Sequence, residues 1–344
     1  QIFFIVSVVF SVMFGVYTPS IIGSLHISLS SFGWLAGMFF IFYAIVQFYS
    51  GRLFVKIPSK YILCASALIS AGGSLLLATA RALQLLFLAR ILLGIGLAST
   101  YVGVLYIVQK NYSPKSFPVM SSLSQCLANL AGALFVFFGG IIIQLISYAI
   151  FFEILAVAFV ICGALVFFGL NDTDVQDKKE QDIPLIEGLK IILKNPQVWL
   201  ASFFFTGIFG TIISFANLFS IPFQHQSFGT AIPQAVMITS MIIFGVTLGS
   251  IVSGVMAKRL NSYVITARVF SLFSVISFAI IMFIRFNTTY YEPIALSIYF
   301  LLGFSLGGCV LAFQCIQENI TQESLRPLAT SFVLTFCLYL CRNH

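Results

Sequence analysis

Long apolar runs separated by short polar segments follow one another along most of the chain. A run of about 20 apolar residues forms a helix long enough to cross the hydrocarbon core of a bilayer. The runs are continuous rather than alternating, which favours helices over membrane-spanning strands. The pattern predicts ten spanning helices and a shorter eleventh, at residues 2–23, 32–50, 61–80, 83–109, 119–143, 148–169, 198–221, 235–257, 263–284, 293–315 and 327–340.

A longer polar stretch, residues 171–195, separates the sixth apolar run from the seventh. Its second part, residues 183–193, spaces its apolar side chains like an amphipathic helix that lies in the membrane interface. Six runs, a charged linker and at least four more runs predict two halves of one bundle. We expect an N-terminal half at 1–170, a cytoplasmic linker at 171–196 and an incomplete C-terminal half at 197–344.

The composition agrees with a membrane protein, because 60% of the residues are hydrophobic and only 8% are charged. A soluble domain has about 25% charged residues, so this chain lacks the charge to cover a surface that faces water. The net charge of +7 would suggest nucleic acid in a soluble protein. Here the cations lie between apolar runs, which indicates membrane topology and no nucleic-acid partner. The predicted fold class is an all-α polytopic membrane protein.

The cations are distributed unequally between the two sides that alternating helices would create. Because cytoplasmic loops are enriched in Lys and Arg, the richer side predicts a cytoplasmic N-terminus and a cytoplasmic linker. The other side holds Arg81 and Arg285, with Arg342 added if the last run crosses. The richer side holds Arg52, Lys56, Lys60, Lys110, Lys115, Lys178, Lys179, Lys190, Lys194, Lys258, Arg259, Arg268 and Arg326.

One short pattern occurs twice, at residues 51–60 and again at residues 254–263. In each copy a glycine stands at the end of a long apolar run and a basic turn leads into the next run. Matching turns in two halves suggest an internally duplicated membrane protein. We therefore predict a gating loop in each half, formed by Gly51, Arg52, Lys56, Lys60, Gly254, Lys258 and Arg259.

The first of these turns resembles the signature that the major facilitator superfamily carries between its second and third helices. The positions that fit are Gly51, Leu53, Lys56 and Lys60. Val55 stands where the family usually has an aspartate, and Pro58 where it usually has a glycine. The family's acid is thought to steady one conformation by contacting a neighbouring helix end. In this chain Val55 replaces the acid in the first copy, and Lys258 stands at the equivalent place in the second. Neither residue can form the contact that the family's acid makes.

A second resemblance is the stretch Arg90–Gly96, which is similar to the family's Arg-x-x-x-Gly signature in helix 4. The stretches 43–47 and 112–117 resemble a bacterial branch of the superfamily, whereas residues 129–133 lack a clear antiporter pattern. The resemblance implies a twelve-helix bundle of two six-helix halves in a bacterial inner membrane. On that basis the short last run predicts a chain truncated near helix 11.

Besides Arg268, which is counted above with the cations of the richer side, two charged residues fall within predicted spans. Arg90 either faces the bundle interior, for contact with a substrate anion or for proton coupling, or extends to the outer interface near Arg81. Glu153 is the one carboxylate that we place inside a span. A carboxylate removed from water takes up a proton more readily, which predicts proton coupling; the alternative is a position shallow enough to reach water.

Uncharged polar residues in other spans have two interpretations. Together they are candidates for a polar substrate pathway, and singly each can form a hydrogen bond between helices worth about 0.6–2 kcal/mol. Gln144 and Asn217 belong to this wider set. The predicted pathway residues are Tyr17, Tyr43, Gln47, Gln125, Asn129 and Gln314.

Two glycine pairs, Gly245–Gly249 and Gly303–Gly307, have the small-xxx-small spacing of closely packed helices. Packing is the interpretation that we adopt, and hinge motion is the alternative. The second stretch also matches the nucleophile elbow of hydrolases, but that motif needs a preceding strand and a nearby histidine. We therefore predict that the protein is not an enzyme.

These patterns together predict a secondary active transporter that moves a small solute by alternating access, coupled to protons. We expect no cofactor, no metal and a monomer in the lipid bilayer. The alternative is a non-transporting membrane protein, either a receptor or scaffold or an inactive remnant. Val55 and the incomplete last run are the features that favour this alternative.

Overall fold

The computed structural model describes residues 1–25, 29–170, 184–212, 215, 220–283 and 291–342. Within these ranges all regular secondary structure is helical, as the apolar runs predict. The chain groups into two compact units. Unit 1 consists of residues 1–110, 134–195 and 322–338, and unit 2 consists of residues 111–133, 196–321 and 339–344.

The two units do not follow the order of the chain. Residues 322–338 group with the N-terminal part of the chain, and residues 111–133 group with the C-terminal part. Each unit therefore contains one helical segment from the other end of the sequence. The predicted halves, 1–170 and 197–344, describe the sequence repeat and stay a prediction. The two compact units describe which segments pack together.

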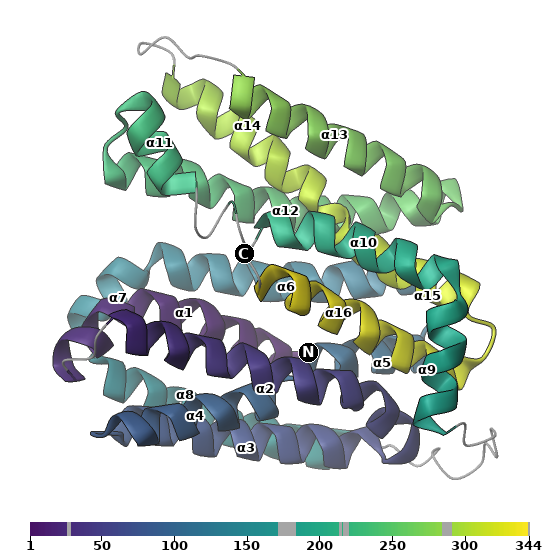
Figure 1. Cartoon of the computed structure of the whole chain (residues 1–344), viewed down its shortest axis with the longest axis horizontal. Coiled ribbons are helices and arrows are strands. Elements are labelled where there is room, and N and C mark those ends of the chain that lie inside the picture. Colours follow the sequence, from purple (N-terminus) through teal and green to yellow (C-terminus); the bar gives the residue numbers. More distant parts are fainter. Residues whose placement is uncertain (26–28, 171–183, 213–214, 216–219, 284–290, 343–344) are drawn as a thin grey trace. The chain divides into compact units, whose positions relative to one another are not determined.

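Unit 1 is built on helix α3, which packs most extensively on α8 and α4 (Figure 1). Small residues on α3 allow this close approach, as is usual in membrane helices. The Ser66 and Ser99 hydroxyls lie 2.6 Å apart, and Ser74 Oγ donates to the Phe152 carbonyl at 2.7 Å. The helices are α1 (Ile2–Leu25), α2 (Leu29–Lys56), α3 (Ser59–Thr79), α4 (Leu83–Leu97), α5 (Thr100–Asn111), α7 (Gly139–Leu145), α8 (Tyr148–Gly169), α9 (Leu185–Lys194) and α16 (Arg326–Arg342).

Unit 2 is built on α12, which lies beside α13 and α14 (Figure 1). A Cβ on Gly245, Gly249, Gly303 or Gly307 would collide with backbone atoms of the facing helix. The packing role predicted for these glycines is therefore confirmed. The helices are α6 (Phe117–Phe137, which enters unit 1 at residue 134), α10 (Pro196–Thr211), α11 (Ser220–Phe228), α12 (Ile232–Leu260), α13 (Tyr263–Phe283), α14 (Tyr291–Leu306), η2 (Gly307–Val310) and α15 (Leu311–Asn319). The short η3 (Glu323–Leu325), which precedes α16, belongs to unit 1.

The described residues contain eight helical segments that are long and apolar enough to cross a membrane. Three predicted runs form shorter ones: the apolar part of α1 is Ile2–Thr18, α10 has 16 residues and α16 has 17. The run at 83–109 breaks between α4 and α5, and the run at 293–315 contains the 3₁₀ segment η2. The polytopic helical fold is confirmed, and the exact helix ends are where the sequence was least informative.

The prediction of basic loops after Gly51 and Gly254 is wrong. Helix α2 continues to Lys56 and α12 continues to Leu260, so both glycines lie inside helices. Only Ile57 and Pro58 connect α2 to α3, and Asn261 ends α12 in a left-handed conformation with φ of 49°. A glycine in a membrane helix allows the close approach of another helix, and the sequence pattern alone does not distinguish this role from a helix end.

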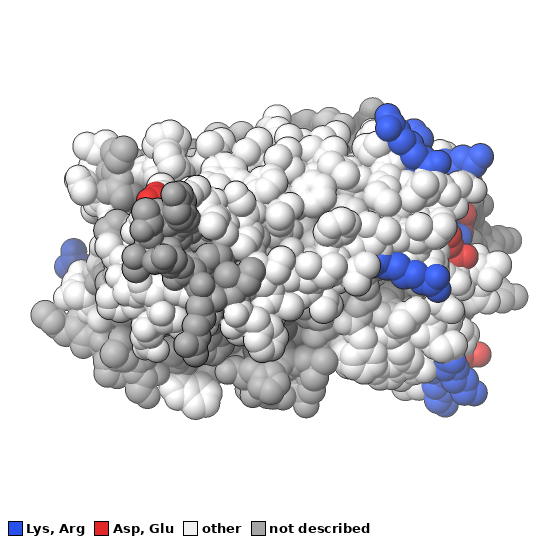
Figure 2. All heavy atoms as spheres, turned by 90° about the horizontal axis from the view of Figure 1, so that it is seen from above, with Lys and Arg blue, Asp and Glu red and all other residues white. Residues whose placement is uncertain are grey.

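The predicted interfacial helix at 183–193 is observed as α9. Ile192 is buried, whereas Ile186, Lys190 and Lys194 are exposed, so the helix presents a mixed apolar and cationic surface. Residues 171–183 of the predicted linker lie outside the described residues. The face shown in Figure 2 is mostly uncharged, as expected for a protein whose helices contact lipid.

Candidate functional site

Arg90 lies two turns into α4 and its side chain is only 3% exposed. It therefore does not extend to the interface near Arg81, and the interior alternative is the one that the structure adopts. A buried guanidinium carries a high desolvation cost, so its surroundings must stabilise the charge.

Backbone carbonyls and aromatic rings surround the Arg90 guanidinium. Nε donates to the Leu35 carbonyl at 3.3 Å, and Nη2 donates to the Ala36 carbonyl at 3.4 Å. The Cζ atom lies 3.9 Å from the ring centre of Phe14 and 4.5 Å from that of Phe39. No carboxylate of the described residues forms an ion pair with Arg90. The charge is thus held by dipoles and cation–π contacts, and the site retains a net positive charge.

The second residue of the Arg-x-x-x-Gly pattern explains how this geometry arises. Gly94 lies one turn after Arg90, and a Cβ there would stand 2.6 Å from the Phe39 carbonyl oxygen. Residues four apart share one face of a helix, so Arg90 and Gly94 both face α2. The glycine lets α4 approach α2 closely enough for the arginine to reach its carbonyls.

Four of the predicted pathway residues form two pairs with each other, and Tyr17 and Gln314 bond to residues outside the predicted set. In unit 1, Tyr17 donates to the Ile146 carbonyl at 2.9 Å, and Gln47 Nε2 lies 3.5 Å from the Tyr43 hydroxyl. In unit 2, Gln125 donates to Asn129 at 3.0 Å, and Gln314 donates to Glu318 at 2.8 Å. Gln144 is exposed, and Asn217 lies outside the described residues. A common pathway through these residues stays a prediction.

Glu153 is exposed on the outer face of α8 rather than buried. Ile150, Ile154 and Val157, which are also exposed, share this face. Glu153 lies within a helical span as predicted, but on the face of α8 that points away from the bundle, so the alternative in which its carboxylate is buried is not observed. Its part in proton coupling stays a prediction.

The predicted gating residues lie at two helix crossings of the same construction. A Cβ on Gly51 would collide with the Pro327 carbonyl and the Ser331 hydroxyl of α16. A Cβ on Gly254 would collide with the Pro118 carbonyl and the Ser122 hydroxyl of α6. Each crossing therefore joins a helical glycine to a proline and a serine four residues apart, near the start of another helix.

The register of the two crossings is constant. The glycines are 203 positions apart (51 to 254), and the prolines are 209 apart (118 to 327), as are the serines (122 to 331). A third contact has the same separations. Gly94 faces the Phe39 carbonyl in unit 1, and Gly303 faces the Ile242 carbonyl in unit 2. The two glycines are 209 positions apart and the two carbonyl residues are 203 apart. The duplication suggested by the glycines thus extends to their contacts.

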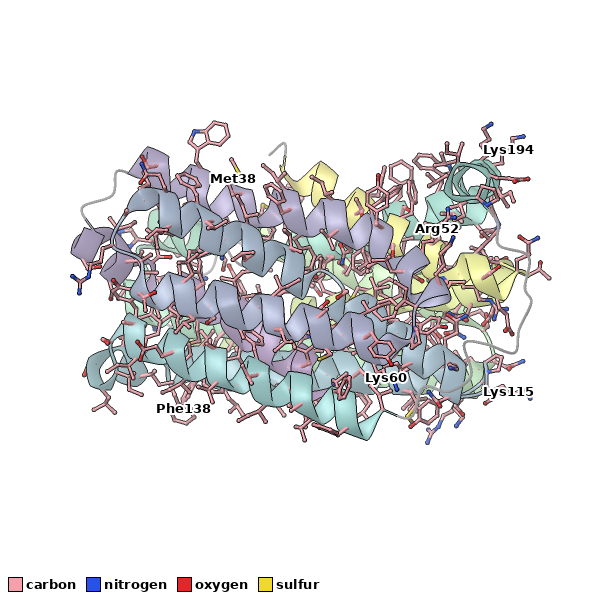
Figure 3. All side chains as sticks on the ribbon, turned by 90° about the horizontal axis from the view of Figure 1, so that it is seen from below. Met38, Arg52, Lys60, Lys115, Phe138 and Lys194 are labelled. Carbon is pink, nitrogen blue, oxygen red and sulfur yellow. The ribbon has the colours of Figure 1, made fainter. Side chains whose placement is uncertain are left out.

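The cations near the first crossing lie at one end of unit 1. Figure 3 places Arg52, Lys60 and Lys194 toward the end that lies opposite to Phe138. Lys60 is in the first turn of α3, and its ammonium group lies 5.0 Å from the ring centre of Tyr61. This clustering is what the unequal distribution of charge predicts for the loops of one membrane side.

Residues 2–341 match the family model for the Major Facilitator Superfamily. The chain belongs to this superfamily. It is therefore an integral, multi-pass membrane protein of a transporter family that is not enzymatic, and members bind small-molecule substrates within the membrane. A comparison with curated protein sequences finds no match.

Solved transporter structures share the fold at low sequence identity. The E. coli fucose:proton symporter is 15% identical, with a TM-score of 0.72 over 97% of this chain and 86% of that one. A bacterial homologue of the iron transporter ferroportin, in an outward-facing state, is 12% identical, with a TM-score of 0.76 over 98% and 87%. A bacterial homologue of the human lysosomal transporter Spinster, inward-facing and unoccupied, is 15% identical, with a TM-score of 0.60 over 98% and 77%.

Within this superfamily the chain departs from the usual signature at the position of the acid. Val55 lies four residues after Gly51 on α2, and Lys258 lies four residues after Gly254 on α12. Neither side chain is acidic. The contacts described above at the two crossings are those of glycine with a proline carbonyl and a serine hydroxyl.

The partners at both crossings, Pro118 with Ser122 and Pro327 with Ser331, were not predicted. A signal was present in the sequence, because each proline stands at the start of an apolar run and is followed by serine four residues later. A buried cluster in unit 2 was not predicted either, where Gln224 Nε2 donates to Ser220 Oγ at 3.1 Å and to Thr239 Oγ1 at 3.0 Å. This cluster joins α11 to α12.

Proposed function

We propose that the protein is a secondary active transporter that moves a small solute across the membrane by alternating access, driven by a proton gradient. Membership of the superfamily supports transport, and the solute and the coupling ion are the proposed parts. The observation that carries the proposal is the pair of crossings at Gly51 and Gly254, built alike in matching registers. Internal repeats with equivalent contacts are the architecture on which alternating access depends.

The two crossings suit helices that meet and separate. At each one, a glycine backbone lies against a carbonyl and a hydroxyl of the other helix. No large side chain of the glycine position interlocks with the partner helix, so the two helices can separate without unpacking one there. We assign the predicted gating role to these helix crossings.

Arg90 is the charged group that we assign to coupling. Its guanidinium is stabilised by carbonyls and rings without a carboxylate among the described residues, so it can attract an anionic group when the surrounding helices rearrange. In the proposed orientation the N-terminus is cytoplasmic and the protein acts as a monomer in a bacterial inner membrane.

The proposal is tested with purified protein in proteoliposomes. Uptake or counterflow of a panel of solutes is measured with an inward proton gradient, and again after an ionophore has collapsed that gradient. Gradient-dependent uptake that Arg90→Gln removes would support the proposal. Uptake that is the same with and without the gradient would contradict proton coupling.

The same experiment addresses the non-transporting alternative, which Val55 favours because the usual acid is missing. A correctly folded protein that moves no solute of the panel, in either direction and under either condition, would support a receptor or scaffold. Size-exclusion chromatography of the reconstituted protein provides the control for folding.

A further inference from the structure

The side-chain amide of Gln314 on α15 has a hydrogen-bonded nitrogen and an oxygen without a partner among the described residues. The side chain is only 6% exposed, and its Nε2 donates to Glu318 Oε1 at 2.8 Å. A carboxylate oxygen accepts hydrogen bonds, so Glu318 fixes which end of the amide faces it. The other end, Oε1, is buried and has no hydrogen-bond partner among the described residues.

Thr206 on α10 presents a second group of the same kind. Its Oγ1 is buried, and within the described part of the chain it has no hydrogen-bond partner either. Other serine and threonine hydroxyls in these helices bond to the carbonyl four residues earlier, as Ser202 does with Val198 at 2.8 Å. The Thr206 hydroxyl does not form this hydrogen bond within its own helix.

The packing of α10 against α15 places these two groups on one side of the helix pair. The rings of Phe205 and Phe313 meet at 5.2 Å, while Cys315 Sγ lies 3.8 Å from the Gln197 carbonyl, so the two helices run in opposite directions. In right-handed antiparallel helices, the residues that follow a facing pair turn toward the same side. Thr206 and Gln314 each follow a member of the Phe205–Phe313 pair.

An unpaired buried acceptor is costly in a membrane protein, because neither lipid nor water is there to satisfy it. A bound ligand is one source of the missing partner. Gln314 Oε1 can only accept a hydrogen bond, so its missing partner must be a donor. The Thr206 hydroxyl can both donate and accept, so its missing partner can be either. Among the described residues no Lys or Arg pairs with either group.

We propose that Gln314 and Thr206 form a hydrogen-bonding subsite in unit 2 for an uncharged solute that carries several hydroxyl groups. Gln314 Oε1 accepts a hydrogen bond from one solute hydroxyl, and Thr206 Oγ1 exchanges a hydrogen bond with another. Glu318 is a positioning residue, because it orients the amide. This inference rests on the proposed transport function and names the substrate class of that transporter.

The test uses the full chain in proteoliposomes with four probes: mannitol and glucose as neutral polyhydroxylated solutes, succinate as an anion and putrescine as a cation. Uptake and thermal stabilisation of the purified protein are measured for each probe. We expect mannitol or glucose to be transported and to stabilise the protein. Gln314→Met, which keeps the length of the side chain, should raise the KM for that solute about tenfold, the loss expected for one hydrogen bond.

Matched variants separate binding from folding. Gln317→Met changes a glutamine on the same helix and should leave the KM unchanged, whereas Thr206→Val should raise it. Glu318→Gln should raise the KM less than Gln314→Met, because the amide stays present but is no longer oriented. If Gln314→Met fails to fold, Thr206→Val and Glu318→Gln carry the test.

The possible failures are distinguishable. Transport of mannitol or glucose with the same KM in Gln314→Met and Thr206→Val would overturn the subsite and leave the transporter. Transport restricted to succinate or putrescine would overturn the substrate class. No transport and no stabilisation with mannitol or glucose would overturn the substrate class, whereas failure to move any solute of the wider panel would contradict the proposed function itself.

Discussion

The crossing at Gly51 in unit 1 and the crossing at Gly254 in unit 2 share their backbone geometry and differ in the residues around it. Both place a glycine against a proline carbonyl and a serine hydroxyl near the start of another helix. Yet four residues after the glycine stands Val55 in one and Lys258 in the other. The comparison teaches that close approach requires particular small residues, whereas the charge beside it can vary.

A second pair of equivalent positions differs more. Arg90 on α4 and Tyr299 on α14 are separated by the same 209 positions as the two prolines. Arg90 lies against the ring of Phe14, and the Tyr299 ring lies 6.0 Å from that of Phe215. Both side chains are 3% exposed. Of these two equivalent residues, only Arg90 in unit 1 carries a charge. We therefore assign coupling to Arg90.

The largest effect is expected from filling the crossings. Gly51→Val and Gly254→Val each force a side chain into backbone atoms, an overpacking that costs about 1–3 kcal/mol or more. We expect transport in proteoliposomes to fall by more than tenfold in both variants. Gly37→Ala and Gly207→Ala are the controls, since a Cβ at either position meets nothing within 4 Å. An active Gly254→Val would show that the two crossings are not equivalent.

The next effect separates Arg90 from Tyr299. Arg90→Gln removes the buried charge and should reduce proton-driven uptake about tenfold or more, whereas Tyr299→Phe keeps the ring and should reduce it about threefold at most. Arg90→Lys should be intermediate, because an ammonium lacks the planar contact with the two rings. Equal losses in Arg90→Gln and Tyr299→Phe would contradict a special role for the charge.

A smaller effect is expected at the position of the missing acid. Val55 and Gly51 share a face of α2, so Val55 lies toward the N-terminal end of α16, where a negative charge is favoured by about 0.3–1 kcal/mol. Val55→Asp should therefore stabilise the present conformation and slow turnover by about threefold. Lys258→Asp should act in the same direction at the start of α6. Cysteine-labelling rates on either membrane side measure the shift, and unchanged rates would exclude it.

The smallest effect concerns the two serines. The hydroxyls of Ser122 and Ser331 are buried without a hydrogen-bond partner among the described residues. Ser122→Ala and Ser331→Ala should therefore raise the free energy of unfolding by about 1 kcal/mol, seen as a thermal midpoint a few degrees higher. Ser121→Ala should not, because its hydroxyl already donates to the Phe117 carbonyl at 2.8 Å. A lower midpoint in the first two variants would reveal a bond that forms in another state.

The apolar runs were sufficient to predict the helices, and their flanking residues were not sufficient to end them. The run at 148–169 became α8 over the same residues, whereas the run at 32–50 became α2, which extends to Lys56. A membrane helix needs only a long apolar stretch for its existence. Its end depends on what it packs against, and Gly51 packs against α16.

The candidate site was predictable in part for the same reason. The cost of burying a cation in lipid predicts that Arg90 needs an interior position, and the structure places it there. The same reasoning placed Glu153 on a membrane span but did not predict which face it occupies, and the structure places it on the exposed face of α8. Hydropathy reports that a residue lies on a spanning helix, but it does not report which face of a nearly uniform apolar helix turns inward.

The sequence by itself determined that this protein is a helical membrane protein with an internal repeat, because the lengths of the runs and the recurring glycines are local properties of the chain. Only the tertiary structure decided what the glycines contact, which carbonyls surround Arg90, and which end of the Gln314 amide is left without a partner. These are contacts between segments that lie tens to hundreds of residues apart in the sequence. They depend on which face of each helix packs against its neighbour rather than on composition.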